Sequence, residues 1–364
     1  MLLGTVAGIA LGATFIGRGH SPAQTAVQQA AGTPAGGSAR AGFGFTPREI
    51  RGVHVTMGLA SIPGRLDKYI ALRAYGLNAL ELDVKDENGK VGFARGAPAL
   101  AAAIGAARAY YDANRAAAAA HDAGLYLIGR VVVFEDPTLT EARPDLAVKR
   151  PDGSVWRTNG GLGWANPYDR RVWKYNVDVA ATAARAGFDE IQFDYVRFPS
   201  DGDLQAMIFP GKRSEPKGRS IARFLAYASG RLHPLGVRVS VDLFGLAATH
   251  DLGVGQVPAR VSRYVDVIYP MVYPSHYNEG EYNITDPDLF PGRTVANSLL
   301  DFRRAVRGRA KIVPWLQDFS IRHTYGQLEV DDQVAAARRQ HVAGFMLWNP
   351  EGVYTKEALS GSSG

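Results

Sequence analysis

Two aspartates in this sequence each close an apolar run of the kind that forms a buried strand. Asp194 lies in the segment EIQFDYVRFP, and Asp242 lies in the segment VRVSVDLFG. In both segments apolar residues occupy every second position, so the aspartate falls in the alternate, polar set. Two carboxyl groups held close together can cleave a glycosidic bond, one as nucleophile or base and the other as acid/base partner. We expect Asp194 to take the first role and Asp242 the second.

These roles require the two carboxyl groups to differ in pKa. Burial raises the pKa of a carboxyl group, and so does a neighbouring negative charge; a confined cleft supplies both. A short gap between the groups would give retention of the anomeric configuration, and a longer gap would leave room for an inverting water. The sequence leaves both outcomes open.

The strands that would position these aspartates belong to a regular series. Helical patterns alternate with the apolar runs, at residues 65–75, 100–122, 170–186, 220–232 and 328–341. Eight β-then-α units predict one closed (β/α)8 barrel, the TIM barrel, and the sequence has no glycine-rich phosphate turn of the kind found in an open doubly wound sheet. The eight expected strands begin at Gly52, Ala79, Leu125, Glu190, Val237, Val265, Lys311 and Gly344.

Alternation within the strands predicts which side chains face the barrel interior. Near the carboxyl ends of barrel strands, inward polar residues line the active-site mouth. In the second strand Glu81, Asp83 and Lys85 form the polar set. A paired structural network explains these three as well as a binding site does, because unpaired buried ions are costly. Two criteria select the expected sugar-binding residues: an inward position in the alternation of a strand, or a place at or near the end of a strand. These residues are His54, Asp83, Lys85, Arg130, Tyr195, Arg197, Tyr273, Gln317 and Trp348.

Other chemistries fit the sequence less well. The chain has no cysteine, which excludes disulfides and thiolate chemistry. No zinc-binding H-E-x-x-H motif and no G-x-S-x-G elbow is present, and we predict no metal site and no cofactor, although a carboxylate-bound Mg²⁺ or Ca²⁺ stays open. A barrel lyase or aldolase would need a Schiff-base lysine, for which Lys85 is the inward candidate; this alternative is the weaker one.

Charge and composition indicate the cellular context. The net charge is +6, but the basic residues are scattered without a long run, so we do not expect a nucleic-acid partner. Residues 1–20 form an apolar segment that is short for a bilayer-spanning helix, and we predict a signal peptide or membrane anchor there. Residues 21–45 read as a low-complexity linker, residues 46–359 as the barrel and residues 360–364 as a flexible tail. The expected location is extracellular or in the cell envelope.

Several motifs resemble those of a bacterial family catalogued as a putative glycosyl hydrolase domain. They are RVVVFED at 130–136, FDYVRFP at 193–199, IYPMVYPSHY at 268–277, VPWLQDF at 313–319 and GFMLWNP at 344–350. The resemblance spans residues 52–351 and implies a TIM barrel of the glycoside hydrolase superfamily that acts on an envelope or extracellular polysaccharide. Asp194 lies in the matching F-D-Y motif. The fifth-strand position is not reliably acidic in related barrels, so Asp83, Asp318 and Glu351 are alternatives to Asp242.

The sequence thus predicts an exported glycosidase whose partner is a polysaccharide or oligosaccharide. The alternative is a barrel that binds carbohydrate without cleaving it. The position of Asp194 separates the two, because a distance of more than about 10 Å from every other mouth carboxylate would exceed the range that either hydrolytic mechanism uses.

Overall fold

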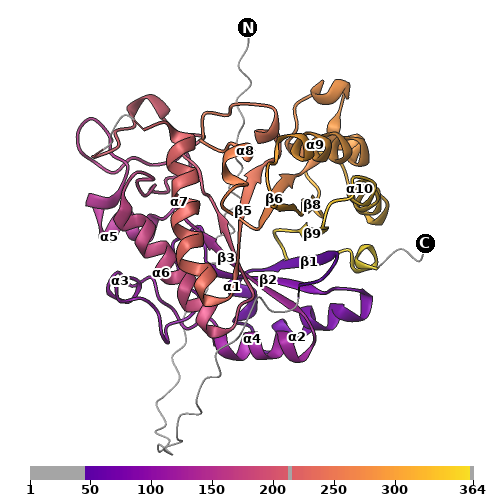
Figure 1. Ribbon diagram of the computed structural model, residues 1–364, viewed down its shortest axis with the longest axis horizontal. Helices are drawn as coiled ribbons and strands as arrows, with labels where there is room; N and C mark the ends of the chain where they lie inside the picture. Colours follow the sequence, from indigo (N-terminus) through magenta and orange to yellow (C-terminus); the bar gives the residue numbers. More distant parts are fainter. Residues whose placement is uncertain (1–45, 212–214, 361–364) are drawn as a thin grey trace, which may run out of the picture.

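Nine strand segments lie side by side in the computed structural model, which describes residues 46–211 and 215–360 (Figure 1). All neighbouring pairs are parallel, in the order β5-β4-β3-β2-β1-β9-β8-β6-β7, and pairing between β5 and β6 closes the ring. The predicted leader at 1–20, the linker at 21–45 and all but the first residue of the tail at 360–364 lie outside the described residues. The strands are β1 Ile50–Val55, β2 Ala79–Lys85, β3 Tyr126–Val132, β4 Glu190–Asp194, β5 Arg238–Phe244, β6 Val267–Val272, β7 Lys311–Ile312, β8 Trp315–Gln317 and β9 Gly344–Trp348.

The segments β7 and β8 are two pieces of one barrel strand. β7 pairs with the first half of β6 and β8 with its second half. Pro314 lies between them, and proline has no N–H to donate to a strand ladder. The barrel therefore has eight strand positions, and the predicted (β/α)8 fold is confirmed.

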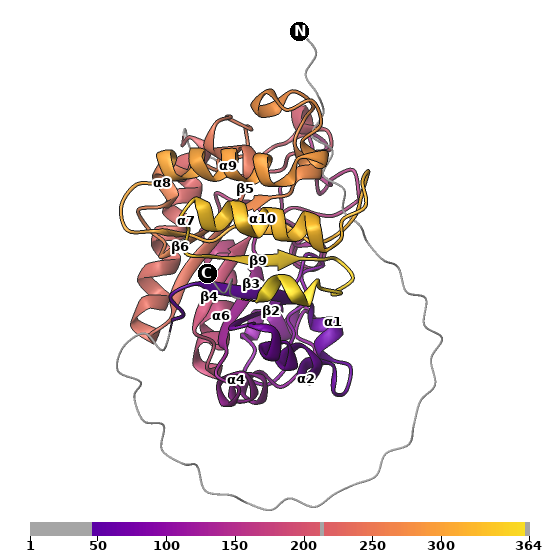
Figure 2. The same cartoon turned by 90° about the vertical axis from the view of Figure 1, so that its right-hand side faces the viewer.

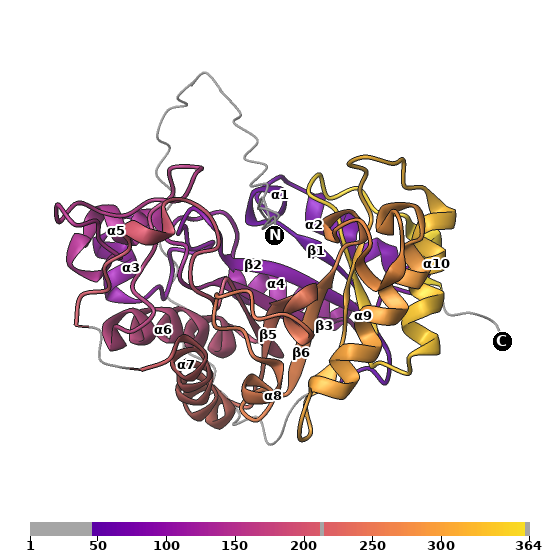
Figure 3. The same ribbon diagram turned by 90° about the horizontal axis from the view of Figure 1, so that it is seen from above.

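Helices surround the strands, as Figure 3 shows for α6, α7, α9 and α10, and Figure 2 shows α9 and α10 lying side by side. None of the helices within residues 46–211 and 215–360 is long and apolar enough to cross a membrane. The helices are α1 Met57–Ala60, α2 Arg65–Ile70, α3 Ala99–Ala103, α4 Ala113–Asp122, α5 Pro137–Ala142, α6 Arg170–Ala186, α7 Lys217–Leu232, α8 Pro258–Val261, α9 Pro291–Ala305 and α10 Gln327–Arg339.

The helix expected at residues 100–122 is wrong as a single element. It is interrupted after α3, because Gly105 adopts a left-handed conformation with φ of +67°. The next residues turn away from the helix axis, and Val91 exchanges backbone hydrogen bonds with Ala106 and Arg108. The helical pattern then resumes as α4, which begins at an Asp112 cap. Local alanine content favours helix throughout, and tertiary pairing overrides it here.

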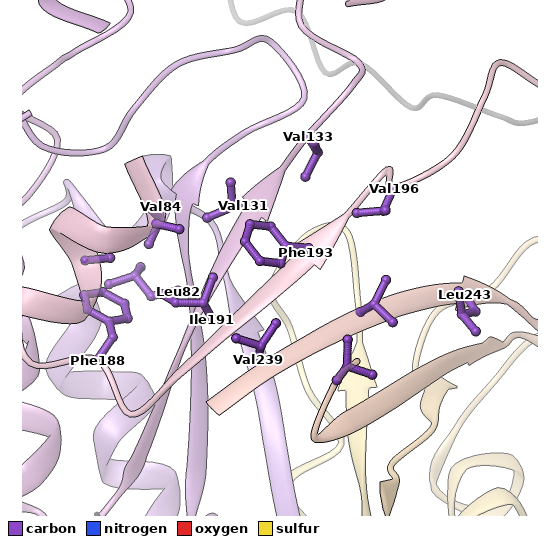
Figure 4. Close-up of a cluster of buried hydrophobic side chains, with 14 of the residues drawn as sticks. Leu82, Val84, Val131, Val133, Phe188, Ile191, Phe193, Val196, Val239 and Leu243 are labelled. Carbon is purple, nitrogen blue, oxygen red and sulfur yellow. The ribbon is translucent and has the colours of Figure 1, made fainter. Parts of the chain in front are cut away.

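The predicted alternation within the strands is confirmed. The apolar residues of one parity, such as Leu82, Phe193 and Val239, pack against the helices in a large buried cluster (Figure 4). A second cluster, which includes Ile50, Tyr126, Ile128, Tyr269, Trp315 and Met346, fills the barrel interior. Most of its members come from the amino-terminal halves of their strands, whereas the inward residues Asp83, Arg130, Asp194 and Asp242 lie in the carboxyl-terminal halves.

Short polar side chains fix the register at the amino end of the barrel. Asn78, Asp189 and Asp266 each precede an even-numbered strand and accept a hydrogen bond from a backbone N–H of the strand region before it. His121 and His233 contact the same carboxylates of Asp189 and Asp266. A slip of one residue would break these bonds, so they help to hold each inward side chain on its face.

Gly344 tests how tightly β9 packs against β1. A Cβ atom at this position would lie 2.1 Å from the backbone oxygen of Ile50, and φ is +124°. We expect Gly344→Ala to lower the free energy of unfolding by about 3 kcal/mol, measured by urea denaturation. Gly230→Ala is the control, because Gly230 is at an exposed position of α7 and nothing lies within 4 Å of that added Cβ. It should raise stability by up to about 1 kcal/mol. Equal effects of the two substitutions would contradict this packing.

Candidate active site

The centre of the barrel mouth is a double ion pair made by Arg130 of β3. Its Nη1 lies 2.9 Å from Oδ1 of Asp83, and its Nη2 lies 2.7 Å from Oδ2 of Asp194. Burial opposes the charge of Arg130, yet the neighbouring Asp194 and Asp83 raise the pKa of its guanidinium above the usual value. One cation therefore joins two carboxylates from β2 and β4.

The carboxyl group of Asp194 has a cationic partner and a backbone donor. Its Oδ2 accepts hydrogen bonds from both Nε and Nη2 of Arg130, and its Oδ1 accepts one from the backbone N–H of Tyr195 at 2.6 Å. Tyr195 has a φ of +50°, a left-handed conformation that is rare for a bulky residue and that ends β4 at this point. The side chain of Asp194 is 11% exposed, so it is shielded but reachable at the mouth.

Asp242 of β5 has the opposite environment. Its Oδ1 accepts hydrogen bonds from Nε2 of Gln192 at 2.6 Å and from Nε1 of Trp315 at 2.8 Å. No cation contacts its carboxyl group among the described residues, and the residue is 2% exposed. Burial, together with the negative charges of Asp194 and Glu81, raises the pKa of Asp242 well above the usual range. Burial and the neighbouring negative charges therefore favour the protonated form of this carboxyl group.

His54, one of the predicted sugar contacts, is 2% exposed and lies level with Glu81, two residues before Asp83 along β2. Its Nδ1 is 2.5 Å from Oε2 of Glu81, and its Nε2 is 3.7 Å from Oδ1 of Asp83. The imidazole also packs on the ring of Trp348, with centroids 4.6 Å apart. Burial raises the pKa of Glu81, although His54 acts against that rise. This position favours a supporting role for His54 beneath Asp83.

Aromatic side chains form the opposite wall of the mouth. Tyr273 is half-buried, and its pKa is raised well above the usual value by burial and then by the charges of Asp242 and Asp194. Its ring contacts those of His276 and Phe319 at centroid distances of 5.4 and 5.6 Å. This wall gives an apolar surface on which a sugar ring can stack.

Two predicted contact residues lie outside the cluster. Lys85 is completely buried, with Nζ 2.7 Å from Oδ2 of Asp136 and 2.6 Å from the backbone oxygen of Val132. Gln317 is also fully buried; it accepts from the N–H of Ser275 and donates to a backbone oxygen. These positions favour structural roles, and they remove the support for Lys85 as a Schiff-base lysine.

The alternative acids are less well placed than Asp242. Both carboxyl oxygens of Asp318 accept hydrogen bonds from Thr355. Glu351 is exposed in the turn that follows β9. Asp83 shares the guanidinium of Arg130 and so has a cationic partner. Among the candidates from the sequence, Asp242 has the environment of an acid.

Glu135 is a mouth residue that the sequence reasoning missed. It lies three residues beyond β3, is 5% exposed, and has its pKa raised to about 7 by burial, against the opposing charge of Arg197. Parity assigns it to the same side as Val131 and Val133, which face the helices. The chain leaves the strand after Val132, so parity no longer holds. The signal in the sequence is the acidic pair that ends the RVVVFED motif.

Outside the barrel, a hollow of about 580 Å³ lies between α4, α6 and the loop that precedes α3. The only acid in its lining is Asp112, whose side chain caps α4. Among residues 46–211 and 215–360, no group of three or more His, Asp or Glu side chains is arranged to hold a metal ion. The paired acids of the barrel mouth are therefore the better candidate for chemistry.

Removing the shared cation should be costly. Arg130→Met would leave Asp83 and Asp194 without their buried partner, and we expect a loss of about 3–5 kcal/mol in the free energy of unfolding, measured by chemical denaturation. Arg143→Met is the matched control, because Arg143 pairs with Asp145 on the exposed surface and should change stability little. Similar losses for the two variants would contradict the central role of Arg130.

The raised pKa of Asp242 predicts a pH-dependent stability. The folded state holds this proton more tightly than the unfolded chain, so the wild type loses stability as the pH rises above about 3.9, towards the folded pKa. Asp242→Asn lacks this loss. The stability of the variant relative to the wild type should therefore increase with pH, by up to about 1.4 kcal/mol per unit, in urea titrations from mildly acidic to neutral pH. A difference that does not change with pH would contradict a protonated Asp242.

Solved structures similar to this chain share the barrel. The glycoside hydrolase domain of PgaB (BpsB) from Bordetella bronchiseptica is 15% identical, with a TM-score of 0.59 over 86% of this chain and 100% of that one. The catalytic domain of a β-amylase from Paenibacillus polymyxa is 12% identical, with a TM-score of 0.53 over 87% and 96%. At these identities the likeness shows the fold alone.

A hypothetical protein from Ruminiclostridium thermocellum ATCC 27405 is more similar in sequence. It is 38% identical over 52% of this chain and 96% of that one, with a TM-score of 0.47. No curated protein matches the chain. A family model described as "Putative glycosyl hydrolase domain" matches residues 52–354, which include every strand except the first two residues of β1. The chain therefore belongs to this glycosyl hydrolase domain family.

Proposed function

We propose that this barrel hydrolyses glycosidic bonds in an extracellular or cell-envelope polysaccharide. The observation that carries the proposal is the contrast between Asp194 and Asp242. Arg130 and a backbone N–H stabilise the charge of Asp194, whereas burial and like charge keep the proton on Asp242. An ionised and a protonated carboxyl group at one mouth are the pair that glycoside hydrolysis needs.

In the proposed reaction, Asp242 gives its proton to the glycosidic oxygen as the bond between that oxygen and the anomeric carbon breaks. Asp194 either attacks the anomeric carbon or takes a proton from the water that does so. The leaving sugar departs as a neutral alcohol, and water supplies the new hydroxyl group. Asp194 keeps its charge until this step because Arg130 holds it.

The remaining mouth residues fit the binding of a sugar chain. Tyr273 and Trp348 are half-buried aromatic residues that can stack on sugar rings. Tyr195 and Arg197 follow β4 directly, and Asp83 and Arg130 have polar atoms at the centre of the cluster. We assign these residues to substrate binding.

A barrel that only binds carbohydrate is the less favoured alternative. Because Asp83 and Asp194 share one guanidinium, their separation is far below the limit of about 10 Å that would favour binding alone. Asp242 is close enough to Asp194 for the charge of Asp194 to raise its pKa. Both facts favour catalysis.

The proposed location follows from the apolar segment at residues 1–20, as a signal peptide or membrane tether. At this location the barrel would have access to extracellular or cell-envelope polysaccharide. Expression of the full chain followed by separation of the cell-envelope, medium and cytosolic fractions tests it, and a purely cytosolic protein would contradict it.

Hydrolysis of a polysaccharide panel tests the catalytic assignment. We expect Asp194→Asn and Asp242→Asn each to lower the rate of reducing-end release by about 100-fold or more, because each loses an acid, base or nucleophile. Asp178→Asn is the matched control, since Asp178 pairs with Lys174 on the surface of α6, and its rate should equal that of the wild type. Wild-type rates in both mouth variants would overturn the assignment.

A further inference from the structure

Glu135 is a buried carboxyl group without a partner. It is 5% exposed, and among the described residues its side chain makes no hydrogen bond and no ion pair within 4 Å. Its backbone forms an isolated bridge with Trp164, which fixes the loop after β3 at the edge of the mouth. Its carboxyl oxygens are not among the fully enclosed side-chain atoms that lack a partner, so they reach the solvent of the mouth and are free to accept from a ligand.

Other acids surround Glu135 from separate segments of the chain. Burial raises its pKa most, the charge of Arg197 lowers it, and the charges of Glu87, Asp201 and Asp194 raise it further. Glu87 follows β2, Asp194 ends β4 and Asp201 lies in the loop after β4. A backbone N–H two residues before Glu135 donates to the backbone oxygen of Asp194 at 2.9 Å, so the segment that carries Glu135 runs beside the end of β4.

The cations nearby are already engaged. The guanidinium of Arg197 lies 4.8 to 4.9 Å from the ring centroids of Trp164, Tyr195 and Phe244, and its Nη1 donates to Ser200. Arg130 binds Asp83 and Asp194 and lies 3.6 Å from Glu87.

Acids therefore outnumber cations on this side of the mouth, although the whole chain has a net charge of +6. The acids are Asp83, Glu87, Glu135, Asp194 and Asp201, and the cations are Arg130 and Arg197. Such a local excess of negative charge attracts a positively charged ligand. A metal ion does not suit it, because no described acids are arranged as a metal site.

We propose that Glu87, Glu135 and Asp201 form an acidic subsite that binds the ammonium group of an amino sugar next to Asp194. The proposal rests on the proposed function, since it places a sugar unit beside the catalytic pair. An ammonium group carries three N–H donors and a positive charge, and it would satisfy the free oxygens of Glu135. An N-acetylated sugar has one neutral donor there and would leave the charge uncompensated.

The experiment compares two tetrasaccharides of equal length that differ in charge. Fully de-N-acetylated chitotetraose and its N-acetylated counterpart are titrated by calorimetry at a pH below the pKa of the free amines, so that these groups carry their protons. All proteins in the titrations carry Asp242→Asn. This substitution removes the proposed acid, so the sugar chain is not cleaved during the measurement. The asparagine is uncharged, as is the protonated form of Asp242. We expect the cationic tetrasaccharide to bind at least about tenfold more tightly.

Glu135→Gln should bring the two affinities within about threefold of each other, because it removes the charge and keeps the shape. Glu87→Gln, at a half-exposed position, should cause a smaller loss in the same direction. Glu141→Gln is the matched control from nearby α5, with a side chain that is 61% exposed, and it should keep the full preference. Thermal melts confirm that each variant is folded.

Equal binding of the two tetrasaccharides, or a preference that survives Glu135→Gln, would overturn the acidic subsite. Hydrolysis is scored separately with wild-type Asp242. An absence of cleavage would count against the catalytic pair, whereas cleavage without a charge preference in binding would count against the subsite.

Discussion

The ion pairs of Arg130 are the constraint on which the mouth of this barrel depends. Three inward side chains from β2, β3 and β4 carry charge in a region that is almost closed to water. Isolated ions are costly there, and the two carboxylates are tolerated because one guanidinium lies between them. The planar group also fixes the orientation of both acids, since its donors point in set directions. The register of the three strands is therefore tied to the geometry of the site.

This arrangement gives two identical side chains opposite electrostatic environments. Asp194 touches the cation, and Asp242, one strand further on, does not. Gln192 and Trp315 donate to one oxygen of Asp242, but neutral donors do not offset its burial beside a negative neighbour. The proposed acid and the proposed base are thus distinguished by position around the barrel and not by residue type.

The sequence was sufficient for the fold because the strands repeat a period of two and are rich in β-branched residues. Alternation also placed His54, Asp83, Arg130, Asp194 and Asp242 correctly in the interior. Alternation does not predict which residue each side chain contacts. The buried ion pair of Lys85 with Asp136 was therefore not predicted. Glu135 was not predicted as a mouth residue because β3 ends before it. The period of a strand carries no information about the loop that follows. The helix break at Gly105 depends on contacts with Val91, which are distant in sequence.

The apolar cluster in the amino-terminal half of the barrel closes the interior at that end, so the site opens only at the carboxyl ends of the strands. Tyr126, Tyr269 and Trp315 fill the interior below the carboxylates, and Glu190 accepts hydrogen bonds from both tyrosine hydroxyls there. A sugar chain cannot thread through a filled barrel, so it has to enter and leave by the same opening. The loops at the carboxyl ends of the strands, rather than the strands themselves, would then decide which unit of a long polymer reaches Asp194.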